Sequence, residues 1–200
     1  MSAQPRPNAA ACFDAVVGDV DELRRHYRQP GTAVIDKQID HVDGGVRAFI
    51  AVSPFVLLAT FGPDGRADVS PRGGHPGFVK VLDDGRLVLP DLNGNNRLDS
   101  LQNIIRTGRV GMLFMIPGLG ETLRVNGSAA VTIDDAILDL FVDEFRRPTS
   151  AIGVVVDEAF IHCAKAIRRS SLWQPDGWPA IDGRPSPAQI FLDHAGIEGV

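Results

Sequence analysis

The stretch that decides the fold runs from Ala67 to Arg97 and reads ADVSPRGGHPGFVKVLDDGRLVLPDLNGNNR. Short apolar runs alternate here with glycine, aspartate and asparagine, which are the residues that form tight turns between strands. At its centre, Phe78–Leu82 and Arg86–Leu89 flank the turn Asp83-Asp84-Gly85. This order of apolar run, Asp-Gly turn and apolar run predicts a β-hairpin.

Two further hairpins are predicted on either side of this one. Phe55–Phe61 and Arg66–Ser70 flank a Gly-Pro-Asp-Gly turn, and Val110–Ile116 and Thr122–Ile133 flank a Pro-Gly-Leu-Gly turn. The β-branched run Ile152–Val156 predicts a last strand. Consecutive hairpins of this kind favour a closed or nearly closed antiparallel barrel, so the expected fold class is mainly β with helices (α+β).

Capping residues and apolar residues spaced three or four apart predict helices around the barrel. Asp19 followed by Glu22 is a capping-box arrangement that begins an N-terminal helical segment. Further helices are predicted just before Pro54 and over Arg97–Arg106, Asp134–Phe145 and Glu158–Arg169.

Composition excludes several classes of function. The 200 residues are 44% hydrophobic and 22% charged, with a net charge of −5. An acidic chain does not offer the broad basic surface of a nucleic-acid-binding protein. No apolar run is long enough to span a bilayer, and two cysteines without a signal peptide indicate a cytoplasmic protein. The histidines and cysteines show no metal-ligand spacing, so no metal site is predicted.

Three cations within the deciding stretch point to an anionic ligand. Arg72, Lys80 and Arg97 stand among glycines and asparagines, and Asn95-Asn96-Arg97 opens a predicted helix. Guanidinium groups and the free N–H groups of a helix N-terminus together suit a phosphate. The alternative for each arginine is a solvated loop. Glycines after Ser70-Pro71-Arg72 would let a flat ligand approach the backbone, or would form a bend in the barrel.

The segment around His162-Cys163 allows two interpretations. His162 and Cys163 lack the partners that a metal site or a nucleophile–base pair requires. Trp173, in a tail rich in proline and glycine, either anchors that tail or covers a planar ligand.

The order of these motifs resembles the pyridoxamine 5′-phosphate oxidase-like family of FMN-binding split barrels. The resemblance covers about Pro54 to Trp173, and its ending is similar to a bacterial branch of FMN-dependent enzymes. It rests on Ser70-Pro71-Arg72-Gly73, Leu89-Pro90-Asp91, Asn95-Asn96-Arg97, Gly111-Met112-Leu113-Phe114, Leu123-Arg124-Val125-Asn126-Gly127 and Phe160-Ile161-His162-Cys163-Ala164-Lys165-Ala166.

The resemblance implies a six-stranded antiparallel split β-barrel that forms a homodimer with FMN at the subunit interface. Residues 1–50 would be an N-terminal extension with helices packing on the barrel, 51–175 the barrel and 176–200 a tail of the same single domain. The implied cofactor-binding residues are Ser70, Pro71, Arg72, Gly73, Lys80, Leu89, Pro90, Asp91, Asn95, Asn96, Arg97, Gln102, Asn103, Lys165, Arg168, Ser171 and Trp173. The last four would approach the flavin from the other subunit.

The expected function is that of an FMN-dependent oxidoreductase that transfers a hydride between flavin N5 and an unidentified small molecule. No side chain is assigned as a catalytic acid or base. The tail Ser170-Ser171-Leu172-Trp173 departs from true pyridoxamine phosphate oxidases, which weighs against vitamin B6 oxidation. The alternatives are a deazaflavin (F420)-dependent reductase, a non-catalytic flavin- or haem-binding protein with His162 or His194 as axial ligand, and a dimeric barrel that has lost its ligand.

Overall fold

The computed structural model describes residues 9–92, 94–180 and 183–197. The chain divides into two compact units, residues 1–37 and 38–200. Parts of the predicted N-terminal extension and tail, residues 1–8, 181–182 and 198–200, lie outside the described residues.

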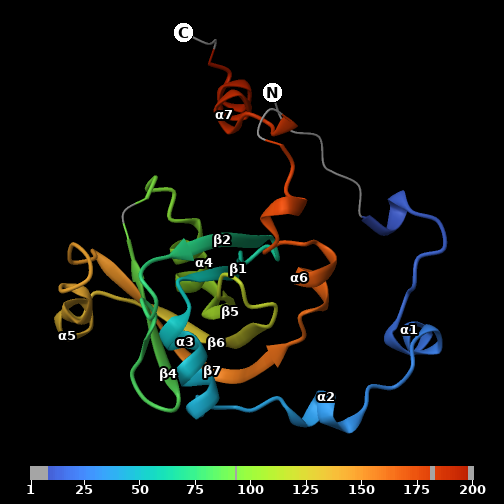
Figure 1. Cartoon of the computed structure of the whole chain (residues 1–200), viewed down its shortest axis with the longest axis horizontal. Helices are drawn as coiled ribbons and strands as arrows, with labels where there is room; N and C mark the ends of the chain where they lie inside the picture. Colours follow the sequence, from blue (N-terminus) through green and yellow to red (C-terminus); the bar gives the residue numbers. More distant parts are fainter. Residues whose placement is uncertain (1–8, 93, 181–182, 198–200) are drawn as a thin grey trace. The chain divides into compact units, whose positions relative to one another are not determined.

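The strands all belong to the second unit (Figure 1). They are β1 (Phe55–Phe61), β2 (Ala67–Gly73), β3 (Lys80–Val81), β4 (Arg86–Asp91), β5 (Arg109–Met115), β6 (Thr122–Thr132) and β7 (Ser150–His162).

The described helices comprise seven α-helices and three short 3₁₀ segments. The α-helices are α1 (Val20–His26), α2 (Thr32–Asp36), α3 (Gly44–Val52), α4 (Asp99–Thr107), α5 (Asp135–Leu138), α6 (Lys165–Arg169) and α7 (Pro187–Ala195). The 3₁₀ segments are η1 (Ala9–Cys12), η2 (Asp139–Phe141) and η3 (Pro175–Gly177).

The first unit contains η1, α1 and α2. Asp19 caps α1, because its carboxylate accepts a hydrogen bond of 2.7 Å from the backbone N–H of Glu22. A side-chain acceptor at this position satisfies one of the otherwise unpaired N–H groups of the first turn. The predicted start of this helix is confirmed.

The second unit is built on one antiparallel sheet with the strand order β2-β1-β5-β6-β7-β4-β3. All three predicted hairpins are confirmed. The implied count of six strands is wrong by one, because Lys80–Val81 forms a seventh, very short strand beside β4. The sheet is not closed: among the described residues β2 and β3 are its two edges, and no ladder joins them.

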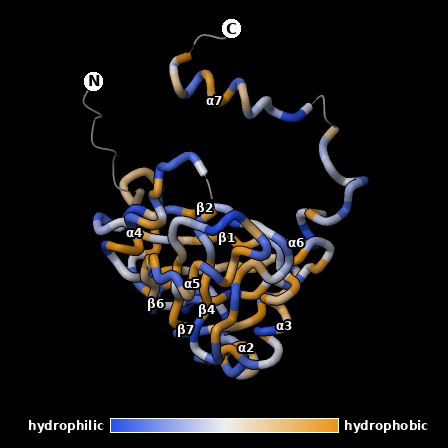
Figure 2. Tube along the Cα trace, turned by 90° about the vertical axis from the view of Figure 1, so that its left-hand side faces the viewer, coloured by the Kyte–Doolittle hydropathy of each residue, from blue (hydrophilic) through white to orange (hydrophobic). Residues whose placement is uncertain are grey.

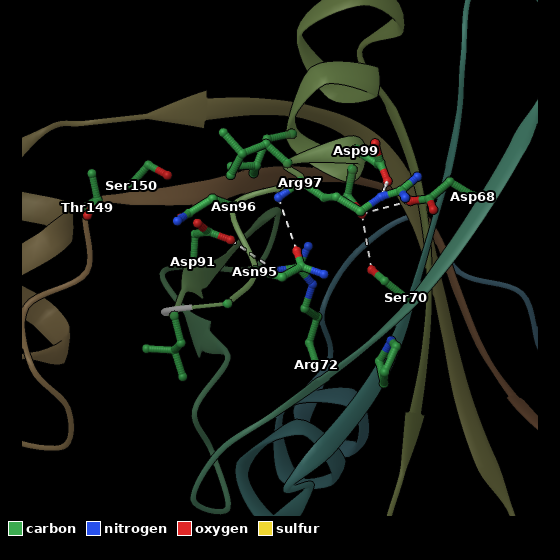
Figure 3. Close-up of a pocket in the computed structure, with 16 residues that line it drawn as sticks. Asp68, Ser70, Arg72, Asp91, Asn95, Asn96, Arg97, Asp99, Thr149 and Ser150 are labelled. Carbon is green, nitrogen blue, oxygen red and sulfur yellow. Dashed lines mark hydrogen bonds and ion pairs between the residues drawn. The ribbon is translucent and has the colours of Figure 1, made fainter. Parts of the chain in front are cut away.

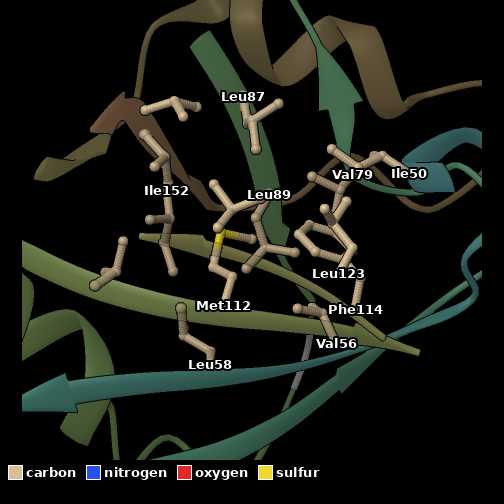
Figure 4. Close-up of a cluster of buried hydrophobic side chains, with 14 of the residues drawn as sticks. Ile50, Val56, Leu58, Val79, Leu87, Leu89, Met112, Phe114, Leu123 and Ile152 are labelled. Atoms are coloured by element: carbon tan, nitrogen blue, oxygen red, sulfur yellow. The ribbon is translucent and has the colours of Figure 1, made fainter. Parts of the chain in front are cut away.

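One hydrophobic core fills the inside of the curled sheet. Side chains alternate along β1 and β5, so that Val56, Leu58, Met112 and Phe114 are buried while their neighbours are not. Leu89 of β4 belongs to the same cluster (Figure 4), although β4 stands far from β1 in the strand order. The sheet therefore bends its two ends toward each other. Hydrophobic and hydrophilic residues alternate along much of the chain (Figure 2).

Two helices cover this core. The α3 helix begins after Asp43, whose carboxylate accepts from the N–H of Val46 at 2.8 Å, and it buries Val46 and Ile50. The α4 helix lies against β1 and β6 and ends at Gly108, which has the positive φ of 66° that suits a C-terminal glycine. The helix predicted before Pro54 thus belongs to the second unit.

The predicted helix over residues 158–169 is wrong in its first half. β7 continues to His162, because it pairs with β6 along its whole length, from Thr132↔Ala151 to Thr122↔His162. The pairing is interrupted once, by a register shift at Asn126/Gly127. Only Lys165–Arg169 is helical. The predicted helix from Asp134 is likewise shorter, since α5 gives way to η2 after Leu138.

None of the helices in the described ranges has both the length and the apolar character that crossing a bilayer requires.

Candidate functional site

The edge strand β2 carries polar side chains on the face that continues the core. Its Asp68, Ser70 and Arg72 lie opposite Thr60, Leu58 and Val56 of β1. Residues two apart on a strand share one face, so these three side chains point to the same side of the sheet. There they meet the loop after β4 and the first turn of α4.

These elements enclose a cleft of about 550 Å³ (Figure 3). It is lined by residues of β2, of the β4–α4 segment and of the approach to β7. They are Asp68, Ser70, Pro71, Arg72, Asp91, Leu92, Gly94, Asn95, Asn96, Arg97, Leu98, Asp99, Ser100, Leu101, Thr149 and Ser150.

Arg72 connects the two ends of the sheet across this cleft. Its Nη1 donates to Asp91 Oδ1 at 3.0 Å, and the two side chains are only 22% and 18% exposed. Arg72 Nε is buried and has no hydrogen-bond partner among the described residues. A buried donor without a partner is costly, so Arg72 has a hydrogen bond to offer a ligand.

Arg97 is the second cation of the cleft and is much more exposed. Its Nε donates to Asp99 Oδ2 at 2.6 Å, and this hydrogen bond raises the pKa of Arg97 above its ordinary value. Its backbone N–H donates to Asn95 Oδ1 at 3.1 Å, which holds the loop before the helix. Arg97 therefore stays positively charged, and its backbone is held beside the first turn of α4.

The predicted helix starts two residues later than expected. Asn96 and Leu98 have positive φ angles of 58° and 59°, in the left-handed region, so the helix begins at Asp99. Asn95, Asn96 and Arg97 consequently form a loop against the first turn of α4 instead of belonging to the helix. That first turn still lines the cleft with its N-terminal end.

Three carboxylates outnumber the two arginines of the cleft by one. Asp91 is held by Arg72 and Asp99 by Arg97, while Asp68 accepts hydrogen bonds from hydroxyl groups. Sequence reasoning recognised Asp91 but missed Asp68 and Asp99. Asp68 could have been found from the alternation of polar side chains along β2, and Asp99 from its place as an acidic residue in the first turn of α4.

Asp68 is the centre of a polar network that was also not predicted. Asp68 Oδ2 accepts from Ser100 Oγ at 2.8 Å and from Thr60 Oγ1 at 3.2 Å. Ser70 Oγ lies 3.1 Å from Ser100 Oγ, and Asn103 Nδ2 donates to Thr60 Oγ1 at 3.0 Å. Ser100 is 3% exposed and Thr60 is fully buried. The network fixes α4 to β1 and β2.

A second cleft of about 490 Å³ shares Asp68, Arg97 and Asp99 with the first. It holds the predicted residues Gln102 and Asn103 of α4. Gln102 Nε2 donates to the backbone oxygen of Arg97 at 3.2 Å, which further supports the loop.

Gly73 and Pro90 lie outside the first cleft. They line a small cleft of about 240 Å³ beside Arg72, and Pro71 lines both of these clefts. Leu89 is fully buried in the core. Lys80 forms an ion pair with Glu144 and lines none of the clefts described here.

Residues 42–168 match the family model described as pyridoxamine 5′-phosphate oxidase. The chain belongs to the pyridoxamine 5′-phosphate oxidase family. A comparison with curated proteins gives no match.

Among the solved structures similar to this pyridoxamine 5′-phosphate oxidase family member, HupZ shares its fold. HupZ from Group A Streptococcus is 15% identical with a TM-score of 0.50, over 60% of this chain and 92% of HupZ. A candidate pyridoxamine 5′-phosphate oxidase from Lactobacillus delbrueckii is 22% identical with a TM-score of 0.48, over 61% of this chain and 95% of that one. These identities speak to the fold alone.

The C-terminal residues expected at the flavin form a separate cleft in this family member. Arg168, Ser171 and Trp173 line a space of about 390 Å³ together with the β5–β6 turn. Trp173 Nε1 donates to the backbone oxygen of Leu119 at 2.7 Å, which favours the anchor interpretation of this tryptophan within one chain. Lys165 opens α6 nearby and is exposed.

Proposed function

We propose that the chain is an FMN-dependent oxidoreductase that acts on a small molecule. The observation that carries this proposal is the meeting of Arg72, Arg97 and the first turn of α4 in one cleft of a pyridoxamine 5′-phosphate oxidase family domain. Its volume of about 550 Å³ lies in the range of pockets that hold ligands of this size.

The donors of the cleft fit a flavin mononucleotide. The buried Arg72 Nε lacks a partner in the described chain and offers one N–H to a ligand acceptor. Asp91 holds the Arg72 guanidinium in place, so little side-chain freedom is lost when a ligand binds. Ser70 adds a hydroxyl oxygen that can accept a hydrogen bond from the ligand.

The phosphate end is best placed at Arg97. Arg97 and the Asn95 and Asn96 amides lie beside the N-terminal end of α4, where the helix dipole favours an anion. Arg97 is paired with Asp99 now, but their side chains are 76% and 45% exposed. An exposed ion pair is weak, so Arg97 can exchange Asp99 for a phosphate at little cost.

When bound, FMN supplies the redox chemistry by accepting a hydride at N5 and returning it to an acceptor. The residues of this chain orient the ligands and set the charge around them. Arg72, whose guanidinium is held in place by Asp91, favours negative charge on a ring bound beside it. No side chain of the cleft needs to act as an acid or base in this proposal.

A deazaflavin with a longer anionic tail is the second candidate. The second cleft continues from Arg97 and adds Arg66 and Arg106, which could contact such a tail. Asp64, in the same cleft, pairs with Arg66 at 3.2 Å and reduces this attraction.

Haem is less well supported, because no histidine lines the four clefts in the described part of the chain.

We also propose a homodimer, through the outer face of β2, β1 and β5. Leu57 lies between Pro71 and Leu113 on this face, and Ala59 lies beside Val69, which is 61% exposed. The outer face of an antiparallel sheet is usually polar, so an apolar stretch on it, here with the charged Arg109 at its end, indicates a covered surface. In such a dimer, the cleft of Arg168, Ser171 and Trp173 would complete the cofactor site of the partner.

The absorption spectrum of the purified protein tests the cofactor, together with mass spectrometry of whatever heat releases. Flavin bands and a released mass of FMN support the proposal. A deazaflavin mass would favour the second candidate. A Soret band, or a colourless protein that does not take up added FMN, would contradict the proposal.

A further inference from the structure

The hydroxyl groups around Asp68 can point their protons in only one way. A carboxylate accepts hydrogen bonds and donates none. Ser100 and Thr60 both contact Asp68 Oδ2, at 2.8 and 3.2 Å, so each gives its single proton to that oxygen.

The next contacts follow from this orientation. Because Ser100 has donated its proton to Asp68, it can only accept from Ser70 across their 3.1 Å contact. By the same reasoning Thr60 can only accept from Asn103, which does present its Nδ2 group at 3.0 Å. The donor group of Asn103 thus faces the hydroxyl oxygen that Thr60 has left to accept, which is consistent with the proton direction imposed by Asp68.

The proton of Ser70 is therefore given to Ser100 and is not available to a ligand in the cleft that both serines line. The lone pairs of Ser70 Oγ remain for a ligand. Water cannot easily reverse this arrangement, because Thr60 is fully buried and Ser100 is 3% exposed. A buried hydroxyl that lost its acceptor would leave an unsatisfied donor.

We propose that Ser70 is a specificity-determining residue that accepts a hydrogen bond from an O–H or N–H group of the bound cofactor, and that Asp68 is the positioning residue that fixes this polarity through Ser100. The inference rests on the proposed function of the cleft. FMN carries ribityl hydroxyls and an imide N–H, either of which can donate to Ser70. A ligand that presents only an acceptor at this position meets lone pairs and is disfavoured.

The experiment measures the dissociation constant of FMN by fluorescence titration in two backgrounds, with Ser70 present and with Ser70→Ala. Ser70→Ala is expected to weaken FMN binding about threefold to tenfold, the effect of one lost hydrogen bond. Ser100→Ala frees the proton of Ser70 to turn into the cleft. It should weaken binding when Ser70 is present, by a smaller factor than Ser70→Ala does because Ser70 Oγ keeps its lone pairs, and have no further effect in Ser70→Ala.

Asp68 is examined with two variants that remove the same charge. Asp68→Asn keeps an acceptor oxygen for Ser100, and Asp68→Ala does not. FMN should therefore bind more tightly to Asp68→Asn than to Asp68→Ala when Ser70 is present, and equally to both in Ser70→Ala. Ser128→Ala on β6, outside all four clefts, is the matched control for loss of a serine hydroxyl.

The two proposals fail in different ways. If Ser100→Ala and Asp68→Ala change the dissociation constant by the same factor in both backgrounds, Asp68 does not act through Ser70 and the inference is overturned while the cofactor stands. Ser100→Ala alone decides this if Asp68→Ala does not fold. A wild-type protein that binds no FMN overturns the proposed function, and the inference with it.

Discussion

Arg97→Ala separates the phosphate end of the cleft from the rest of it. A charge-assisted hydrogen bond to a phosphate raises affinity by roughly 10- to 100-fold. Arg97 is 76% exposed and must leave Asp99 before it can bind, which places the expected effect at the lower end. We expect the dissociation constant of FMN to rise about tenfold.

The same exposure makes this a clean perturbation of binding. The Arg97 guanidinium contacts Asp99 on the surface and no core residue, so the variant should unfold at the wild-type temperature. Arg66→Ala is the matched control, because Arg66 is 84% exposed, pairs with Asp64 and lines the neighbouring cleft but not the first one.

The assay is fluorescence titration with FMN and with riboflavin, which has the same ring and ribityl chain but no phosphate. Arg97→Ala should weaken the binding of FMN and leave that of riboflavin as in the wild type. An unchanged dissociation constant for FMN would refute the placement of the phosphate. An equal loss for both ligands would show that Arg97 contributes to the shape of the cleft instead.

Three further predictions concern the scaffold. Gly127→Ala should lower the free energy of unfolding in urea by at least ~1–3 kcal/mol, because a Cβ there would lie 2.1 Å from the backbone oxygen of Val155; a wild-type midpoint would contradict this. Arg86 and the backbone N–H of Gly85 donate hydrogen bonds to the Asp83 carboxylate, which lowers its pKa below 3.8. The ion pair in this turn is therefore kept until the pH falls through the lowered pKa. Carboxyl NMR titration should show that Arg86→Ala raises the pKa of Asp83, and an unmoved value argues against the pair. Leu113→Arg should turn a dimer into a monomer in analytical ultracentrifugation, and an unaltered dimer would place the interface elsewhere.

The hairpins could be predicted because their information is local. Asp64-Gly65 and Asp84-Gly85 are turn residues between apolar runs, and both turns form where expected. β7 could not be predicted in full. Phe160, Cys163, Ala164 and Ile167 have helical spacing, but pairing with β6 over long range prevails for the first of them.

The site was predicted in part for a similar reason. Arg72 and Arg97 are in the cleft as expected, since they belong to consecutive pieces of one motif. Lys80 lies in the same motif but forms an ion pair with Glu144, more than sixty positions later in the chain. Nothing near Lys80 in the sequence indicates that partner. The role of Asp68 depends on the approach of α4 to β2, which sequence periodicity does not reveal.

The Arg72–Asp91 ion pair has a consequence for the unliganded protein. It joins β2, an edge of the open sheet, to β4 near the opposite edge, and no ladder does so among the described residues. The same arginine offers Nε to the cleft. A ligand that bonds Arg72 therefore adds its binding free energy to the cohesion of the seam between the two edges. Ligand binding and the separation of β2 from β4 are therefore coupled. A change that separates the two strands weakens ligand binding, and a bound ligand stabilises the arrangement in which they lie together.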